Sequence, residues 1–254
     1  MTDLSDIEHW LNLCLIDGLG DESIRRLLIA LGSPAKVRAT NLNILQRIIK
    51  KPIAEKLKRG AEPSKITTAL NWLKDSTNSI ITLADTDYPK QLLNISDPPP
   101  LLYFKGNRKL LNTPALAIVG SRNATPQGIF NAESFAKAAS NSGLCVISGM
   151  ALGVDTAAHY GGLQGSASSI AVVGTGLDIV YPAKNHQLAH ALAKDGALIS
   201  EFPLGTPAKG RNFPRRNRII SGMTQGCLIV EAALRSGSVI TAQQALEKGR
   251  EVLA

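Results

Sequence analysis

Two patterns of apolar residues divide the chain. From residue 1 to about residue 75, apolar side chains recur at intervals of three and four, the spacing of amphipathic helices. Two series are especially regular: Ile7, Trp10, Leu11 and Leu15, then Ile24, Leu27, Leu28 and Leu31. The spacing therefore predicts a small all-α domain over residues 1–76.

A tight turn is expected between the first two helices, at Asp17-Gly-Leu-Gly-Asp21. Helix, glycine turn and helix together form a helix-hairpin-helix motif, which in many proteins holds one phosphate of a nucleic acid. A purely structural turn explains these residues equally well, and the two flanking carboxylates oppose strong phosphate binding.

The pattern changes after a proline-rich linker that runs through Asp85-Thr-Asp-Tyr-Pro89 and Asp97-Pro-Pro-Pro100. Short apolar runs without polar alternation then alternate with helix-like segments, as in strands buried on both faces of a parallel sheet. The predicted strands are 115–119, 144–147, 170–173, 197–199 and 227–230, with a further strand at 249–254; the predicted helices are 128–141, 154–163, 185–194, 215–222 and 238–248. Residues 77–254 are thus predicted to form an α/β domain, an extended Rossmann-like, mostly parallel sheet with helices on both faces.

Small and polar residues follow each predicted strand, and in a parallel sheet these loops meet at one edge. Glycines there allow close backbone approach, and the following helix N-termini attract anions. The candidate positions are Gly120, Ser121, Arg122, Gly149, Gly153, Gly174 and Gly176. One such loop is weak evidence, whereas five that converge predict a phosphate site.

A dense basic cluster lies after the strand at 197–199. Lys209, Arg211, Arg215, Arg216 and Arg218 accompany Phe213 and Asn217, and no acidic residue occurs between Leu204 and Arg218. Arginine forks match phosphate oxygens in pairs, and an aromatic ring can stack on a base. A solvated basic loop is the alternative.

The overall charge supports an anionic partner. The chain of 254 residues carries a net charge of +8. Residues 1–35 have a net charge of −4 and residues 36–65 a net charge of +7, so two separate basic regions produce the surplus. Six cations of the 36–65 region could line one face of a duplex-binding module: Arg47, Lys50, Lys51, Lys56, Lys58 and Arg59. A solvated helical surface is the commoner explanation.

Signatures of catalysis are weak. No GxxxxGK[ST] phosphate loop occurs, and Gly174-Thr-Gly176 is followed by Ile179 where a dinucleotide fingerprint needs glycine. His186 and His190 are four residues apart without HExxH and are expected on a solvent-facing helix. Glu231, ahead of Ser236-Gly-Ser238, is the best candidate acid, although a role in capping a helix or orienting an arginine is favoured. We therefore expect no catalytic residue, metal or cofactor.

The three cysteines lie far apart in apolar runs, no signal-peptide pattern occurs, and no apolar run approaches ~18 residues. These features predict a soluble, cytoplasmic protein with reduced thiols and no membrane association.

Taken together, the motifs resemble the DprA/Smf family of bacterial DNA-processing proteins. The resemblance rests on residues 80–105, Ile118-Val-Gly-Ser-Arg122, Ser148-Gly-Met-Ala-Leu-Gly-Val-Asp155, Gly174-Thr-Gly-Leu-Asp-Ile-Val-Tyr-Pro182, Phe213-Pro-Arg-Arg-Asn-Arg-Ile-Ile-Ser-Gly222 and the region from Glu231 to Ala242. It implies a recombination mediator of natural transformation that binds single-stranded DNA, loads RecA onto it and dimerises. The helical segment over residues 1–76 resembles the sterile-alpha-motif-like or helix-hairpin-helix extension of that family.

The resemblance also implies roles for individual residues. Arg122 would clamp a phosphate, Lys184, Lys209 and Arg211 would surround the same pocket, and Phe213 would stack on a base. At least one of Arg215, Arg216 and Arg218 is expected to pair with Glu201 or Glu231. Family members normally continue beyond the segment that ends at Ala254, so the chain resembles a shortened member whose dimer contact is in doubt.

An enzymatic alternative stays open at this stage. A Rossmann-like nucleotide or phosphoribosyl hydrolase would use Glu231 as acid or base and Arg122 to hold a phosphate. It would need a carboxylate pair behind a glycine-rich loop, and only Glu231 is present there.

Overall fold

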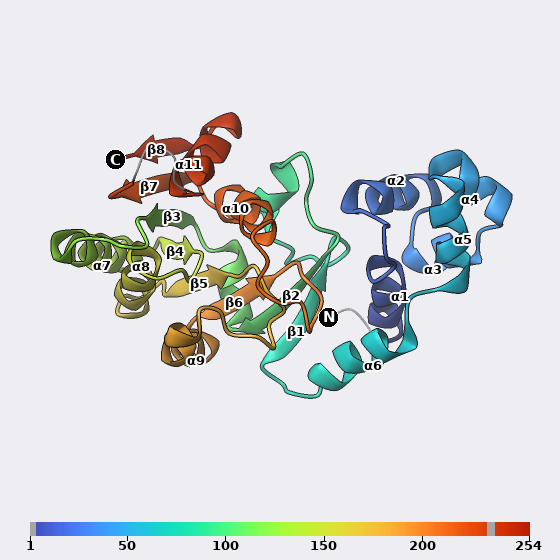
Figure 1. The fold of residues 1–254 in the computed structure, drawn as a ribbon, viewed down its shortest axis with the longest axis horizontal. Helices are drawn as coiled ribbons and strands as arrows, with labels where there is room; N and C mark the ends of the chain where they lie inside the picture. Colours follow the sequence, from blue (N-terminus) through green and yellow to red (C-terminus); the bar gives the residue numbers. More distant parts are fainter. Residues whose placement is uncertain (1–3, 233–236) are drawn as a thin grey trace. The chain divides into compact units, whose positions relative to one another are not determined.

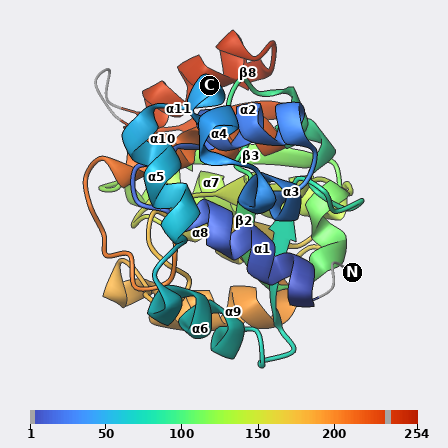
Figure 2. The same cartoon turned by 90° about the vertical axis from the view of Figure 1, so that its right-hand side faces the viewer.

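The computed structural model describes residues 4–232 and 237–254. Two compact units are present, one formed by residues 1–86 and 97–102 and the other by residues 87–96 and 103–254 (Figures 1 and 2). The boundary expected between residues 76 and 77 stays a prediction.

The first unit begins with six helices, as the apolar spacing predicts. They are α1 (Leu4–Cys14), α2 (Asp21–Leu31), α3 (Pro34–Ala39), α4 (Leu42–Ile48), α5 (Lys51–Arg59) and α6 (Pro63–Trp72). Proline occurs in the first turn of α3, α5 and α6, where its missing N–H costs no hydrogen bond. Fully buried leucines from α1, α2, α4 and α5 form the core: Leu11, Leu27, Leu45 and Leu57.

Prolines 98–100 join the first unit through a specific contact. The guanidinium of Arg25 on α2 donates a hydrogen bond to the backbone oxygen of Pro98 at 3.0 Å. The unit also contains β1 (Asn78–Thr82), where Asp85 accepts hydrogen bonds from the backbone and hydroxyl of Thr82 at 2.8 and 2.9 Å.

The sheet has the strand order β1-β2-β6-β5-β4-β3-β7-β8. The remaining strands are β2 (Leu101–Gly106), β3 (Ala115–Gly120), β4 (Cys145–Ser148), β5 (Ser169–Val172), β6 (Ala197–Ser200), β7 (Gly226–Val230) and β8 (Glu251–Leu253). Strands β3 to β8 pair in parallel, and β2 pairs antiparallel with β6. This mostly parallel α/β sheet confirms the predicted fold class.

Five α-helices connect the parallel strands: α7 (Pro126–Asn141), α8 (Val154–Leu163), α9 (His186–Asp195), α10 (Asn212–Met223) and α11 (Gly237–Glu247). Helix α8 packs against both α7 and α9, whereas α10 packs against α11 (Figure 1). The chain runs from β3 outward to β6 and then returns across β3 to β7. Because such crossovers are right-handed, the return places α10 on the opposite face from α7 and α8.

Two parts of the sequence interpretation need correction. Strands β1 and β2 were not expected, because their apolar runs stand beside prolines that suggested only a linker. Helix α10 starts at Asn212 and not near residue 215, so Asn212, Phe213 and Pro214 lie in its first turn and not ahead of it.

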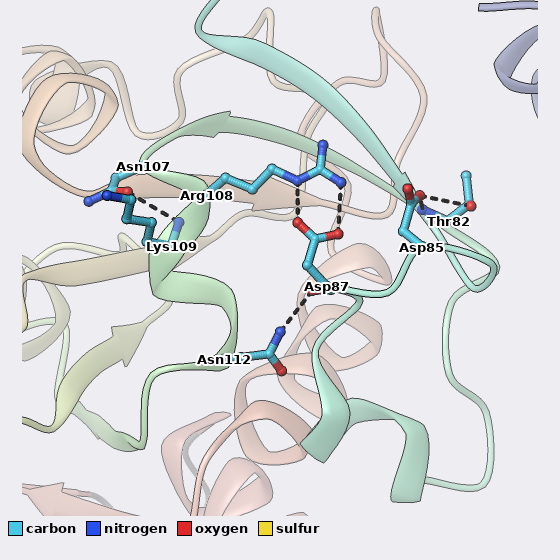
Figure 3. A network of polar contacts seen from close by, with 7 residues as sticks. All are labelled: Thr82, Asp85, Asp87, Asn107, Arg108, Lys109 and Asn112. Atoms are coloured by element: carbon cyan, nitrogen blue, oxygen red, sulfur yellow. Dashed lines mark hydrogen bonds and ion pairs between the residues drawn. The ribbon is translucent and has the colours of Figure 1, made fainter. Parts of the chain in front are cut away.

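Within the second unit, a polar network anchors the segment predicted to be a linker (Figure 3). Arg108 donates two hydrogen bonds to the carboxylate of Asp87, one of them from Nη2 at 2.8 Å. Asn112 donates to the backbone oxygen of Asp87 at 2.9 Å and accepts from the backbone N–H of Lys90 at 3.0 Å. Residues 87–90 are therefore held against the 3₁₀ helix Arg108–Asn112.

A candidate nucleic-acid interface

A cleft of about 570 Å³ lies at the carboxyl ends of the parallel strands. Strand β3 contributes one wall, and the N-terminal parts of α10 and α11 contribute others. Helices leave β3 and enter β7 on opposite faces of the sheet, so this is the topological switch point, where open α/β sheets bind ligands. The lining includes Gly120, Ser121, Arg122, Asp155, Phe213, Arg216, Asn217 and Ser238.

Arg122 provides an exposed cation at the mouth of the cleft. It directly follows the Gly120-Ser121 end of β3, and its guanidinium carbon lies 6.0 Å from the centre of the Phe213 ring. Within the described part of the chain, the Arg122 side chain makes no hydrogen bond or ion pair. Its charge is thus available to an anion.

An aromatic pair stands beside this cation. The rings of Phe213 and Tyr181 are 5.7 Å apart between centroids and tilted by 33°. Tyr181 is 49% exposed. Tyr181 was not among the predicted site residues. The feature of the sequence that could have indicated it is an aromatic residue in the glycine-rich segment after β5. Two neighbouring rings offer a surface on which bases can stack.

A buried arginine forms the floor. Arg216 is 5% exposed, and its Nη1 donates to the backbone oxygen of Val172 at 2.8 Å. Its buried Nε has no hydrogen-bond partner. Burial lowers the pKa of Arg216 to about 10, the attraction of Asp155 opposes this shift, and the charge of Arg122 adds to it. Two guanidinium groups that repel each other in this way are stabilised by an anion.

Asp155, in the first turn of α8, supplies a negative charge that interacts with the buried Arg216. Its carboxylate accepts hydrogen bonds from the backbone N–H groups of Gly149 at 3.1 Å and Ala151 at 3.3 Å. Burial raises its pKa, against the opposing effects of Arg216 and these hydrogen bonds. The carboxylate of Asp155 thus joins the loop Gly149–Ala151 to the charge of Arg216.

Glu201 immobilises the other two arginines of α10. Its side chain is only 2% exposed. The carboxylate accepts a hydrogen bond from Arg215 Nε at 3.0 Å and lies 2.9 Å from Arg215 Nη2, and it also accepts a hydrogen bond from Nη2 of Arg218. The guanidinium of Arg215 additionally lies 5.6 Å from the centre of the Phe202 ring. The expectation that an arginine of the cluster pairs with Glu201 is confirmed.

The candidate glycines are each pressed against protein atoms. A Cβ at Gly149 would lie 1.7 Å from Nη1 of Arg216, and one at Gly120 would lie 1.8 Å from the backbone oxygen of Val230. At Gly153, where φ is +78°, and at Gly174 and Gly176 the nearest atoms are at 2.3, 3.0 and 2.4 Å. The small residues therefore allow protein packing at this edge, and their contact with DNA stays a prediction.

The remaining candidates occupy different surroundings. Ser121 and Asn217 line the cleft, and Asn217 donates to the backbone oxygen of Gly237 at 3.3 Å. Lys184, Lys209 and Arg211 are exposed and lie outside the cleft lining.

A family model matches the part of the chain that contains the cleft. Residues 79–254 match the family described as DNA recombination-mediator protein A. The chain belongs to the DprA/Smf family. It is 39% identical over 257 residues to protein Smf of Escherichia coli (strain K12), covering 98% of this chain and 66% of that protein. It is 43% identical over 173 residues to the DNA processing protein DprA of Streptococcus pneumoniae, covering 68% of this chain and 61% of that protein. The chain thus spans just under two thirds of these relatives.

Solved DprA structures share the fold. DNA processing protein A from Streptococcus pneumoniae superposes with a TM-score of 0.83 at 33% identity, over 99% of this chain and 86% of that one. DNA processing protein A from Helicobacter pylori, whose structure is described as revealing a unique single-stranded DNA binding mode, superposes with a TM-score of 0.63 at 31% identity. The second match covers 68% of this chain and 79% of that one.

Glu231, the candidate acid of the alternative enzyme, has a structural role in this DprA/Smf chain. Its carboxylate accepts hydrogen bonds from the backbone N–H of Thr125 at 2.8 Å and from the Thr125 hydroxyl. These bonds lower its pKa. Thr125 caps α7, so Glu231 supports α7 and not the following helix; Ser236 lies outside the described residues.

Other reactive side chains of this DprA/Smf chain have ordinary surroundings. His159 is fully buried, with Nδ1 2.7 Å from the Ser169 hydroxyl and Nε2 accepting from the Met150 N–H at 3.3 Å. His186 and His190 are exposed on α9, as expected. Burial raises the pKa of the Cys145 and Cys227 thiols to about 12, so neither is an available nucleophile. Residues 4–232 and 237–254 contain no cluster of metal-ligating side chains and no helix long and apolar enough to cross a membrane.

Proposed function

We propose that this chain binds single-stranded DNA in the cleft and acts as a recombination mediator without a catalytic step. The observation that carries the proposal is the position of Arg122, an exposed cation that has no ion pair among the described residues. It lies beside the Phe213–Tyr181 pair and near the buried Arg216. A phosphate between the two guanidinium groups would remove their repulsion, and the rings would receive the adjoining bases.

The dimensions and chemistry of the cleft favour a single strand. A volume of about 570 Å³ is within the range of small-ligand pockets and suits a nucleotide. Bases of a single strand expose their faces, and stacking of one base on an aromatic ring contributes roughly 1–3 kcal/mol with little sequence preference. The Helicobacter pylori relative, whose structure is described by its single-stranded DNA binding mode, supports this choice.

The cations divide into two roles in this proposal. Arg122, Lys184, Lys209 and Arg211 are exposed and neutralise phosphates. Arg215 and Arg218 are held by Glu201 and keep α10 in place, and Arg216 forms the floor. Gly120, Ser121 and Asn217 complete the wall, and the glycines at 149, 153, 174 and 176 shape the surrounding loops.

Fluorescence anisotropy of a labelled oligonucleotide tests the proposal. We expect tighter binding to the single strand than to the duplex, with affinity that falls as salt rises. Arg122→Ala should weaken single-strand binding strongly. Lys137→Ala removes an equal charge from an exposed position on α7 outside the cleft lining, and should leave it nearly unchanged. Equal, weak binding to both probes, unaffected by Arg122→Ala, would refute the proposal.

Family membership is the basis for the proposed partners. We propose that the chain loads RecA onto the bound strand and forms a homodimer. The measurement for the first is the rate of RecA filament formation on single-stranded DNA with wild type and Arg122→Ala; the proposal requires acceleration by wild type that the variant lacks. Sedimentation analysis over a range of concentrations determines whether this chain dimerises.

A hydrolase would need Glu231 as a proton donor or acceptor. Its carboxylate instead accepts hydrogen bonds from Thr125, and its lowered pKa disfavours the protonated form that a proton donor needs. Release of free base from nucleoside monophosphates, lost in Glu231→Gln, would overturn the binding-only proposal.

A further inference from the structure

The first unit has a cavity of its own, of about 510 Å³. The turn between α1 and α2, the first turn of α2, the end of α4 and the start of α5 surround it. Its lining consists of Gly18, Ser23, Arg26, Gln46, Arg47, Ile48, Ile49, Lys50 and Ile53. Three of these residues are cationic, and none is acidic.

Several lysines of this unit use their ammonium groups in hydrogen bonds or ion pairs within the unit. Lys56 donates to the backbone oxygen of Asp17 at 3.1 Å. Lys58 donates to the backbone oxygens of Arg38 and Thr40 at 2.9 and 3.1 Å. Lys65 forms ion pairs with Asp17 and Glu62. These lysines stabilise the turn and the ends of helices.

Arg26, Arg47 and Lys50 differ from those lysines. All three are exposed, and within the described residues none has a hydrogen bond or ion pair from its side chain. They come from α2, α4 and the residue before α5, so the fold brings three unneutralised charges to one cavity. Such an arrangement costs electrostatic repulsion that an anion relieves.

The backbone around the cavity is suited to an anion as well. Gly18 has a φ of +88°, which makes the tight turn possible, and Gly20, the N-cap residue of α2, has no side chain to cap the helix. The first N–H groups of α2 are therefore not occupied by a capping side chain. Asp21 and Glu22 stand in that first turn but do not line the cavity, which predicts moderate affinity.

We infer that this cavity is a second phosphate-binding site, which takes a backbone phosphate of a nucleic acid independently of the cleft in the other unit. Arg26 and Arg47 supply guanidinium forks, Lys50 adds a third charge, and Gly18 admits the phosphate to the turn. The choice of a nucleic acid as the source of the phosphate rests on the proposed function.

The test compares four forms of the whole chain by anisotropy, with single-stranded and duplex oligonucleotides over a salt series. They are wild type, Arg26→Gln/Arg47→Gln, the charge-matched control Lys36→Gln/Lys74→Gln, and Arg122→Ala. Lys36 and Lys74 are exposed residues of the same unit outside the cavity lining. We expect the arginine double variant to lose about tenfold or more in affinity at low salt and the control to lose much less.

The salt dependence gives a second readout. For each lost phosphate contact the slope of log affinity against log salt should decrease by about 0.9 for a duplex or about 0.7 for a single strand. Spectra of ¹⁵N-labelled chain should also show shifts of the Gly18 and Ser23 amides on addition of oligonucleotide, and of inorganic phosphate at higher concentration. Equal affinities and slopes for the arginine variant and its control would overturn the inference.

The two proposals fail separately. If Arg122→Ala binds like wild type while Arg26→Gln/Arg47→Gln loses binding, the cleft proposal fails and the second site stands. If only Arg122→Ala loses binding and the Gly18 and Ser23 amides do not move, the second site is refuted and the cleft stands. Shifts caused by inorganic phosphate but not by either oligonucleotide would refute a nucleic acid as the ligand.

Discussion

Replacing Glu201 by glutamine should destabilise the second unit substantially. The substitution keeps the shape of the side chain and removes the charge that holds Arg215 and Arg218. Arg218 is only 9% exposed, so it would remain as a buried cation without its compensating carboxylate. Arg215 is 49% exposed and has access to water in the variant.

The magnitude follows from the burial of each partner. Hydrogen bonds to charged groups contribute about 1.5–3 kcal/mol when buried, which applies to Arg218. The half-exposed Arg215 adds up to about 1 kcal/mol because water screens it. Since glutamine keeps an acceptor oxygen, we expect Glu201→Gln to cost about 2–3 kcal/mol.

Urea unfolding followed by far-UV circular dichroism measures this cost. Both tryptophans, Trp10 and Trp72, belong to the first unit, so tryptophan fluorescence reports on that unit and provides an internal reference. Glu133→Gln removes a charge from α7, where the carboxylate accepts one hydrogen bond from Gln164, and should cost less than about 0.5 kcal/mol. Adding Arg218→Met to Glu201→Gln should recover part of the loss.

The reasoning would be refuted if Glu201→Gln and Glu133→Gln cost the same. In that case the stability of the second unit would not depend on the contact between Arg218 and the Glu201 carboxylate.

Three further outcomes are expected. Phe213→Leu should cost about 1–3 kcal/mol of single-strand binding free energy in anisotropy, whereas Phe213→Tyr should bind like wild type; equal losses would exclude stacking. Thr125→Ala should lower the free energy of unfolding by about 1–2 kcal/mol because it removes the cap of α7 and a ligand of Glu231, and Thr125→Ser should restore most of it. Asp87→Asn should cost up to about 1 kcal/mol in urea unfolding at neutral pH. The hydrogen bonds of Arg108 hold the pKa of Asp87 below its usual 3.8 in the folded state, so this contribution is complete above 3.8 and disappears as pH falls through the lowered pKa. A difference from wild type that persists in acid would contradict that assignment.

The sequence was sufficient to predict the elements that have a strong apolar signature. Helices of the first unit and the parallel strands β3 to β7 were located because their buried residues follow clear spacings. Strands β1 and β2 were missed because prolines border them, and the antiparallel pairing of β2 with β6 depends on tertiary contacts between residues almost a hundred positions apart.

The sequence indicated which residue types make up the candidate site, but not how their side chains are arranged. The basic cluster and Arg122 were identified, but a charge count cannot distinguish an arginine held by Glu201 from one buried on the floor or one exposed to solvent. Tyr181 was overlooked because its contact with Phe213 joins the segment after β5 to the first turn of α10, which lie far apart in the sequence. The carboxylate of Glu231 reaches Thr125, 106 positions earlier in the chain, and no local pattern encodes such a contact.

The close packing of Gly149 against Arg216 has an evolutionary consequence. Any side chain at position 149 would overlap the guanidinium, so a lineage that gains one there has to move the arginine head group away from the backbone oxygen of Val172 or replace it. Loss of the arginine first would open a space that a larger residue at 149 could fill, after which a return to arginine would be blocked. Among descendants of such a chain we therefore expect the two positions to change together.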